Sequence, residues 1–362
     1  MCGGDGLFSV SNRLNRSEES FRGPLKTLAS LTREPSLFQE RMITPMDTDL
    51  WTEKYRPPTL REIVGQESVI QSLVRFVETR NVPHCLFAGP PGTSKTTAAI
   101  AMAKDLFGDS FDRNFMELNA SDERGIEVVR NQIKHFARTL PTENAPFKIL
   151  VLDEADHLTS DAQHALRRTM ETYAASCRMI LICNYSSRII PPIQSRCAVF
   201  KFTRLSDSDV AGRIDYIAKN EGVQLLSTGK EAILYLAEGD MRTAINLLQA
   251  ASSASRKITD SVVYGMSGQA DPSKVRDMLT KTQSSSYNSA LEMLDDLIYQ
   301  QGLSPSDLVR QIHREVMKLD IPEDWRMKIL ERTAETEFRI AEGANGEIQL
   351  AALLSFIGLG SG

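Results

Sequence analysis

One stretch of eight residues decides the fold of this chain. It reads Gly89-Pro90-Pro91-Gly92-Thr93-Ser94-Lys95-Thr96 and lies between an apolar run, 84–88, and a helical pattern, 96–106. A Gly-rich turn between a buried strand and a helix aims backbone N–H groups and the positive end of the helix dipole at one point, which suits a phosphate. We therefore expect all eight residues to form a phosphate-binding loop, with Lys95 on the β- and γ-phosphates.

One position in this loop departs from the usual pattern, which places Gly before the Lys. Here that residue is Ser94. Backbone and phosphate approach each other closely at this point, so a Cβ is awkward. Because Ser is the mildest replacement, we expect weakened or slowed ATP handling rather than its loss. A chance Gly/Pro turn is the competing interpretation of the loop, and the second motif argues against it.

The second motif is an apolar run, 149–152, that ends in Asp153-Glu154. The carboxyl end of a buried strand is where ligands gather in α/β sheets. Asp153 and the Thr96 hydroxyl are our candidates for holding Mg²⁺, and Glu154 is our candidate base for activating water. Loop and carboxylates together predict an ATPase or an ATP-driven switch. Asp156 we interpret as a charge at the start of the following helix.

Three further side chains are candidates for phosphate chemistry, each with a simpler alternative. Asn184 follows the apolar run 179–183 and could present its amide to the γ-phosphate or to the attacking water, although Asn there is often a turn former. Arg196 could reach a neighbouring subunit's γ-phosphate or could cap a surface helix. Arg242 begins a helix and could contact phosphate within the chain or remain a solvated charge.

A basic stripe is the candidate nucleic-acid contact. Arg130, Lys134 and Arg138 follow one another at four-residue spacing, which places them on one helix face. Such stripes are mostly solvated surface, but this one matches a phosphate backbone and needs to read no bases. The net charge of −5 argues against wholesale coating of nucleic acid and permits a local stripe.

Composition indicates an ordinary globular protein with room for two or three domains: 362 residues, 41% hydrophobic and 25% charged. Apolar runs such as 179–183 are too short to cross a bilayer. The five cysteines form no C-x-x-C pair, so we interpret them as reduced, mostly buried thiols of an intracellular protein.

The chain divides into four segments. Residues 1–45 have no sustained period and are interpreted as a disordered tail or as the result of a start codon chosen too far upstream. Residues 46–206 alternate short apolar runs with helical patterns, which predicts an α/β core with a mostly parallel sheet covered on both faces. The expected strands are 84–88, 115–118, 148–152, 179–183 and 199–202. Residues 207–270 and 271–362 show helical periodicity only and are expected to form a small lid and a C-terminal helical domain.

Seven sequence blocks, taken in order, resemble the small subunits of replication factor C, the AAA+ ATPases that load the sliding clamp. The resemblance runs from about Asp47 to the C-terminus, and 1–45 has no counterpart. The blocks are Trp51-Thr52-Glu53-Lys54-Tyr55-Arg56-Pro57, Val64-Gly65-Gln66 and the loop above; Leu118-Asn119-Ala120-Ser121-Asp122-Glu123-Arg124-Gly125 and Leu152-Asp153-Glu154-Ala155-Asp156; then Ser195-Arg196-Cys197 and Gly239-Asp240-Met241-Arg242. The run Phe338-Arg339-Ile340-Ala341-Glu342-Gly343-Ala344-Asn345 is similar to the end of the family's collar.

The resemblance assigns the candidate residues to roles. It implies that Tyr55, Arg56 and Val64 line the adenine site. Asn184 looks like the sensor-1 residue and Arg242 like sensor 2.

Further roles concern contacts outside the subunit. Arg196 would be the finger that completes the next subunit's site, and Arg130 and Lys134 would track the DNA backbone. The helices of 271–362 would form the collar of a pentameric ring.

The implied cofactors are ATP and Mg²⁺. The implied partners are a large clamp-loader subunit and further small subunits in a heteropentamer, a PCNA-type sliding clamp and primer–template DNA, with no membrane. The location would be cytoplasmic for an archaeal type and nuclear for a eukaryotic one. A junction-migrating motor is a rival that should lack the Ser-Arg-Cys and collar blocks. A ring subunit that binds ATP with little turnover is a second rival, suggested by Ser94.

Overall fold

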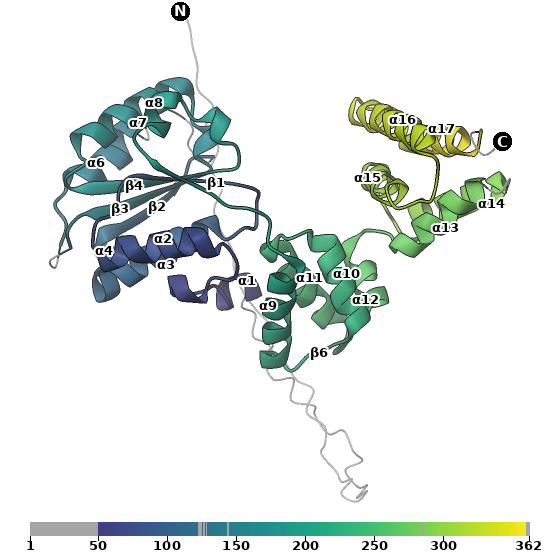
Figure 1. Ribbon diagram of the computed structural model, residues 1–362, viewed down its shortest axis with the longest axis horizontal. Coiled ribbons are helices and arrows are strands. Elements are labelled where there is room, and N and C mark those ends of the chain that lie inside the picture. Colours follow the sequence, from purple (N-terminus) through teal and green to yellow (C-terminus); the bar gives the residue numbers. More distant parts are fainter. Residues whose placement is uncertain are drawn as a thin grey trace, which may run out of the picture. The chain divides into compact units, whose positions relative to one another are not determined.

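The computed structural model describes residues 50–359 apart from 122–124, 126, 128, 143–144 and 284–285 (Figure 1). The expected tail, 1–45, lies outside the described residues.

A five-stranded parallel sheet forms the first part of the described chain, which confirms the α/β prediction. Its order is β2-β3-β4-β1-β5, and every pairing is parallel. Each expected strand is present, with ends shifted by one or two residues. The strands are β1 (Cys85–Ala88), β2 (Phe115–Asn119), β3 (Lys148–Asp153), β4 (Cys177–Cys183) and β5 (Ala198–Lys201).

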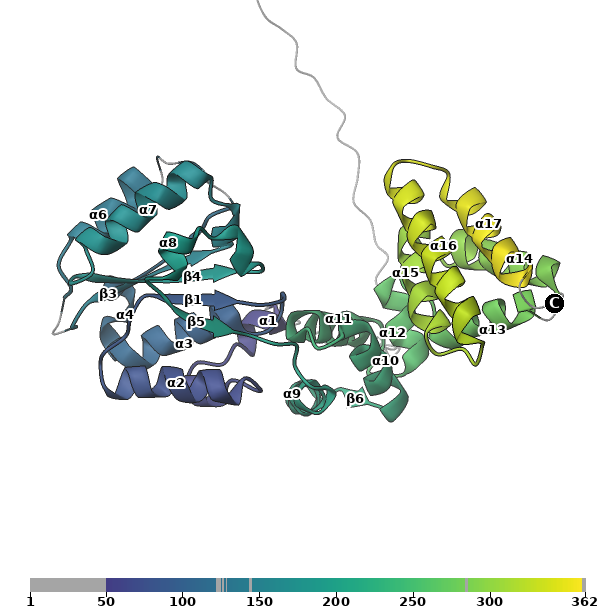
Figure 2. The same ribbon diagram turned by 45° about the horizontal axis from the view of Figure 1, so that its top comes forward.

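Both faces of the sheet are covered, which explains why its three inner strands, β1, β3 and β4, are buried along almost their whole length. Figures 1 and 2 show α2 (Glu67–Glu78) and α3 (Lys95–Phe107) on one face, and α6 (Lys134–Arg138) and α7 (Ser160–Thr172) on the other. In the inner strands, alternate residues enter two separate cores: Phe87 packs with the first helix pair and Leu86 with the second.

Several short elements complete this part. They are α1 (Trp51–Lys54), α4 (Phe111–Asn114), α8 (Pro191–Gln194), a π-helix at Val129–Ile133, and 3₁₀ turns at Leu60–Glu62, Gly108–Ser110, Ala155–His157 and Ser186–Arg188.

The next part, called the lid below, is a small and mostly helical region with its own core. Its helices are α9 (Asp207–Asn220), α10 (Ser227–Ala237), α11 (Met241–Ala254) and α12 (Asp260–Ser267). The prediction that strands end near residue 205 is wrong, because β6 (Gln224–Leu225) pairs in parallel with β7 (Lys257–Ile258). Two-residue strands are too short to show an alternating pattern.

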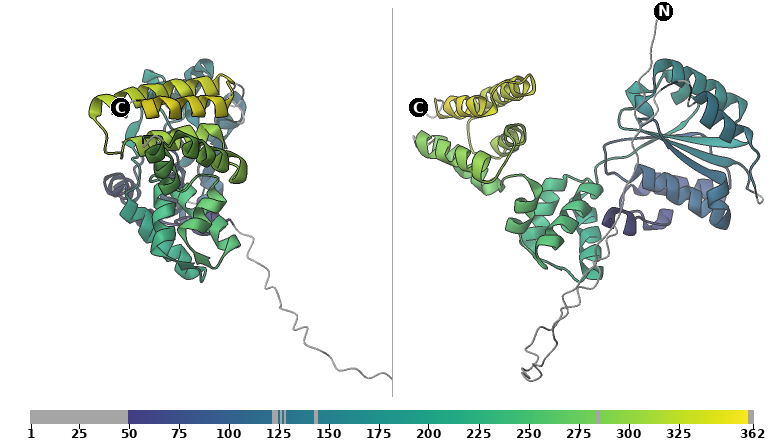
Figure 3. Two further views of the ribbon diagram at one scale, coloured as in Figure 1. Left: turned by 90° about the vertical axis from the view of Figure 1, so that its right-hand side faces the viewer. Right: turned by 180° about the vertical axis from the view of Figure 1, so that it is seen from behind.

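The last part is all helical, as expected, and has a separate core. It contains α13 (Pro272–Gln283), α14 (Tyr287–Asp295), a π-helix at Asp296–Gln300, α15 (Pro305–Val316), α16 (Glu323–Ala341) and α17 (Gly346–Leu359). Figure 3 shows α16 and α17 packed side by side. No helix among the described residues is long and apolar enough to cross a membrane. Four cysteines lie among the described residues, all of them in the sheet part (Cys85, Cys177, Cys183 and Cys197), and each is a free thiol.

Candidate functional site

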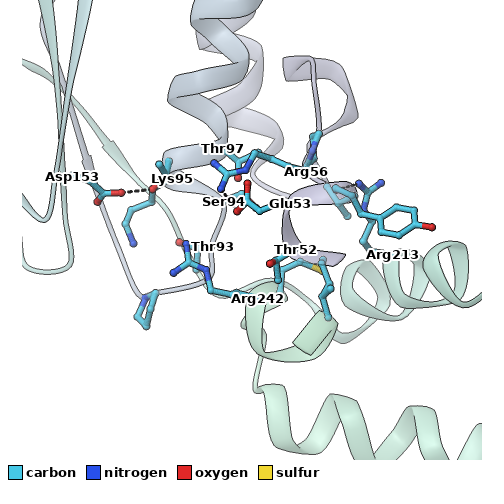
Figure 4. Close-up of a pocket in the computed structure, with 18 of the residues that line it drawn as sticks. Thr52, Glu53, Arg56, Thr93, Ser94, Lys95, Thr97, Asp153, Arg213 and Arg242 are labelled. Atoms are coloured by element: carbon cyan, nitrogen blue, oxygen red, sulfur yellow. Dashed lines mark hydrogen bonds and ion pairs between the residues drawn. The ribbon is translucent and has the colours of Figure 1, made fainter. Parts of the chain in front are cut away.

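One pocket brings together most of the predicted site residues (Figure 4). It lies where β1 and β3 end and the phosphate loop begins, and helices α9 and α11 of the lid supply its other wall. The predicted residues that line it are Tyr55, Arg56, Val64, Pro91, Gly92, Thr93, Ser94, Lys95, Thr96, Asp153, Glu154, Asn184 and Arg242.

The phosphate loop has a backbone that favours glycine at two positions. Gly92 has φ +66°, and a Cβ built on it would lie 1.8 Å from Oδ1 of Asp240. Its carbonyl also accepts a hydrogen bond from Met241 N at 3.1 Å, so the loop packs directly on the start of α11. Ser94 has φ +69° and ψ 21°, the left-handed conformation that L-residues disfavour. Backbone conformation at position 94 is therefore one physical reason for glycine there, in addition to close approach of a phosphate.

Lys95 is buried, with 7% of its surface exposed. Its Nζ donates to the carbonyls of Gly89 at 2.7 Å and Pro90 at 2.6 Å, and lies 3.4 Å from Oδ1 of Asn184. Burial lowers the pKa of Lys95, and the nearby Asp153 carboxylate opposes that shift. Gly89 and Pro90, which do not line the pocket, thus act on the site by holding the ammonium group.

Thr96 and Asp153 meet at the junction of α3 and β3. The Thr96 hydroxyl donates to Asp153 Oδ2 at 2.7 Å, and Asp153 Oδ1 accepts from Glu154 N at 2.8 Å. A hydroxyl beside a carboxylate is an oxygen set that suits Mg²⁺, which commonly keeps several waters and binds substrate phosphates. Within the described ranges no group of three or more His, Cys, Asp or Glu side chains could hold a metal ion.

Glu154 occupies strained backbone. Its φ is +51°, a left-handed value that costs a non-glycine residue about 1 kcal/mol or more. Its carboxylate is 41% exposed and lies 3.2 Å from Nδ1 of His157. Glu154 thus lines the pocket directly after Asp153 with a carboxylate that is open to water, which suits a water-activating base.

The interpretation of Asp156 as a helix-start charge is wrong. Helix α7 begins at Ser160 and is capped by the Thr159 hydroxyl, whereas Asp156 is buried in a 3₁₀ turn. Its Oδ2 accepts a weak hydrogen bond from Tyr185 N at 3.4 Å. Asp156 thus supports the backbone that follows Asn184, a contact between two strand ends that local sequence does not show.

Asn184 and Arg242 reach the pocket from different parts of the chain. Asn184 follows β4, the central strand of the sheet. Arg242 is the second residue of α11, whose first turn is capped by Asp240 Oδ1 accepting from Thr243 N at 2.9 Å. Figure 4 shows Arg242 extending toward Thr93 of the phosphate loop.

Besides Gly89 and Pro90, three predicted residues do not line the pocket. Arg196 lies beyond α8, where its Nη1 donates to Pro192 O at 2.7 Å and its Nη2 lies 2.5 Å from Glu171 Oε1. Lys134 is exposed at the start of α6. The side chain of Arg130 lies outside the described residues.

Sequence reasoning missed two charged residues of the pocket wall, Glu53 and Arg213. Arg213 is half-buried in α9, and its Nη2 donates to the main-chain carbonyl of Tyr55 at 2.5 Å. Thr52, Thr97, Met241 and Ile245 also line the pocket and were not predicted. Arg213 belongs to no motif, so only its place on the pocket-facing side of α9 identifies it.

Two protein-family profiles match the chain. Residues 85–205 match the ATPase family associated with various cellular activities (AAA), and residues 270–355 match the replication factor C C-terminal domain. The second match falls on the C-terminal helices that carry the expected collar block.

Whole-chain relatives agree with these profiles. The replication factor C small subunit of Methanocella arvoryzae is 49% identical over 309 residues, which cover 85% of this chain and 96% of the relative. The protein of the same name from Sulfolobus acidocaldarius is 50% identical over 312 residues, covering 86% of this chain and 96% of the relative.

A solved structure of the Thermotoga maritima RuvB Holliday junction branch migration motor is also similar, with a TM-score of 0.50 and 18% identity over 73% of this chain and 90% of that one. At that identity the likeness concerns the fold alone. The matches to the two replication factor C small subunits, by contrast, each cover 96% of the relative. The chain therefore belongs to the replication factor C small-subunit family, and its pocket lies in an AAA ATPase domain.

Proposed function

We propose that the chain is a clamp-loader subunit that binds ATP with Mg²⁺ in the pocket described above and hydrolyses it to load a sliding clamp onto primer–template DNA. The observation that carries this proposal is the Thr96–Asp153 pair, which places a Mg²⁺-type oxygen set beside buried Lys95 and solvent-open Glu154.

Each residue has a distinct task in the proposed reaction. Lys95 leaves the carbonyls of its own loop and pairs with the β- and γ-phosphates, while loop N–H groups bind the same oxygens. Thr96 and Asp153 hold Mg²⁺, which when bound neutralises charge on the phosphates. Asn184 orients the attacking water, and Glu154 accepts its proton.

Arg242 and Arg196 complete the phosphate contacts from outside the loop. Arg242 acts from the lid of the same subunit. Arg196, on an exposed surface and paired with Glu171, would exchange that partner for the γ-phosphate bound by an adjacent subunit. Hydrolysis then removes the contact and weakens the interface between subunits, which releases the clamp.

The proposed partners follow from the family. They are a large subunit and further small subunits in a heteropentamer, the sliding clamp, and DNA, whose backbone Arg130 and Lys134 would follow. Exposed Lys134 supports that contact. The proposed location is the cytoplasm, in association with the chromosome, for an archaeal type and the nucleus for a eukaryotic one.

Steady-state ATP hydrolysis tests the proposal. We expect turnover by the assembled protein that rises with primed DNA and clamp, and that Glu154→Gln abolishes while leaving ATP binding intact. Tight ATP binding without turnover in the wild type would instead support the alternative, a nucleotide-gated structural subunit, which the left-handed Ser94 favours.

Mixing two inactive variants tests the role of Arg196 across the interface. Arg196→Ala and Glu154→Gln should each be inactive alone. In a ring whose neighbours are copies of this chain, an interface with intact Glu154 on one side and intact Arg196 on the other should recover turnover. Inactive mixtures in such a ring would contradict action between subunits.

A further inference from the structure

The first helix of the described chain, α1, packs on the lid. Trp51 is 7% exposed and belongs to the hydrophobic core of the lid, and its N–H donates to Gln249 Oε1 of α11 at 3.1 Å. By contrast Leu60 is fully buried in the core beneath the sheet, where its N–H donates to Asp105 Oδ2 at 3.0 Å. The chain therefore crosses from the lid to the sheet domain between residues 55 and 60.

This crossing forms one end of the pocket. Tyr55, Arg56 and Pro57 line the pocket, together with Val64 just beyond the crossing. In Figure 4, Arg56 and Arg213 lie at the opposite end from Asp153 and Lys95. Since the phosphates belong with Lys95, this end receives the nucleoside.

Side-chain contacts attach the segment to α9 and its end. The Tyr55 hydroxyl donates to Glu221 Oε1 at 2.6 Å, and Lys54 Nζ lies 3.1 Å from the same oxygen. The Tyr55 ring also meets the Tyr216 ring edge to face, with 6.2 Å between centroids. None of these contacts holds the main chain where it turns toward the pocket.

Arg213 supplies a side-chain contact to the main chain of this segment. Its Nη2 donates to the Tyr55 carbonyl at 2.5 Å, and its guanidinium carbon lies 5.3 Å from the centroid of the Tyr216 ring. The planar guanidinium is held both by a charge-assisted hydrogen bond and by an aromatic face, an arrangement that Lys can reproduce only in part.

We propose that Arg213 is a positioning residue of the nucleotide site: it fixes the turn at Tyr55–Pro57 and thereby shapes the pocket for the purine nucleoside. The proposal rests on the proposed ATP binding of the same pocket. Because Arg213 acts through the turn, it should affect binding of the nucleoside part of the ligand. Its effect on affinity should therefore be the same whatever the number of phosphates.

Equilibrium binding of ATP, ADP and inorganic tripolyphosphate to the full chain tests this. We expect Arg213→Ala to weaken ATP and ADP equally, by about tenfold, because a turn without its charge-assisted hydrogen bond is less well ordered. Tripolyphosphate should bind as it does to the wild type. Arg213→Lys should recover part of the loss. Lys219→Ala, an exposed position on the same helix, should change nothing.

Two results would overturn the proposal. One is unchanged ATP affinity in Arg213→Ala. The other is an equal loss for tripolyphosphate, which would mean that the substitution damages the whole site. A wild-type chain that binds none of the three ligands would instead overturn the proposed function, so the two failures are distinguishable.

Discussion

At the scale of single residues, the backbone at Ser94 sets how well the phosphate loop is prepared for its ligand. Its left-handed φ of +69° disfavours a residue with a Cβ. We expect Ser94→Gly to raise the free energy of unfolding by no more than about 1 kcal/mol, since relief of strain is partly offset by glycine's extra freedom when unfolded. We also expect faster ATP turnover, measured at saturating ATP.

Gly92 provides the matched control. Gly92→Ala adds a Cβ that would lie 1.8 Å from Asp240 Oδ1, so it should weaken ATP binding and lower stability. Unchanged turnover in Ser94→Gly would mean that the loop is already ordered with serine.

His84 makes stability depend on pH. Burial lowers its pKa to about 4, aided by the charge of Arg178, and its Nδ1 accepts a hydrogen bond from Met179 N at 3.0 Å. In the unfolded chain His84 takes up a proton below its ordinary pKa of 6.5, whereas in the folded protein it stays neutral down to about pH 4. Neutral His84 therefore contributes to the free energy of unfolding. This contribution is fully present above pH 6.5 and is lost as pH falls toward about 4, and the total loss is on the order of 3 kcal/mol.

Urea unfolding at several pH values across that window tests the linkage. His84→Gln should flatten the pH dependence even though it lowers stability at neutral pH. The control is His135→Gln, at an exposed position of α6. It should show the same dependence of the free energy of unfolding on pH as the wild type. An equally steep slope in His84→Gln would assign the dependence to other groups.

At the scale of elements, the first turn of α11 joins the lid to the phosphate loop. Asp240 caps this helix, and its carboxylate occupies the space beside Gly92. We expect Asp240→Ala to lower the free energy of unfolding by about 1 kcal/mol and to raise the KM for ATP, because Arg242 lies in the turn that Asp240 caps. Asn is a good cap, so Asp240→Asn should retain most of the stability; equal losses in both variants would argue against capping as the cause.

At the scale of the whole molecule, a buried carboxylate ties the lid to the C-terminal helices. Glu315 of α15 is 0% exposed and accepts hydrogen bonds from Tyr235 of α10 at 2.9 Å and from Lys318 at 2.8 Å. Arg276 of α13 lies 3.2 Å from its other oxygen. Tyr235→Phe removes one donor from a buried charge, so we expect a loss of about 1–3 kcal/mol in the free energy of unfolding.

Hydrogen exchange in α10 and α15 should locate that loss at the junction. The control is Tyr216→Phe. Because Tyr216 is 54% exposed, this substitution should lower the free energy of unfolding only slightly. A loss of the same size in both variants would exclude the Glu315 contact as the cause.

The sequence by itself determined the features that depend on neighbouring residues. The phosphate loop is a local turn, and apolar runs such as 149–152 are buried on both faces whatever packs there. The Asp153–Glu154 pair follows one of these runs, so its place at a strand end could be predicted. Family blocks then supplied roles for Asn184 and Arg242.

The tertiary structure decided what depends on distant residues. Arg213 meets the Tyr55 carbonyl across 158 positions, and the Tyr185 N–H reaches Asp156 across 29. Neither contact leaves a periodic signal, because a single hydrogen bond fixes no pattern of side chains along the chain. The packing of Trp51 on the lid depends likewise on long-range burial, which sequence spacing does not encode.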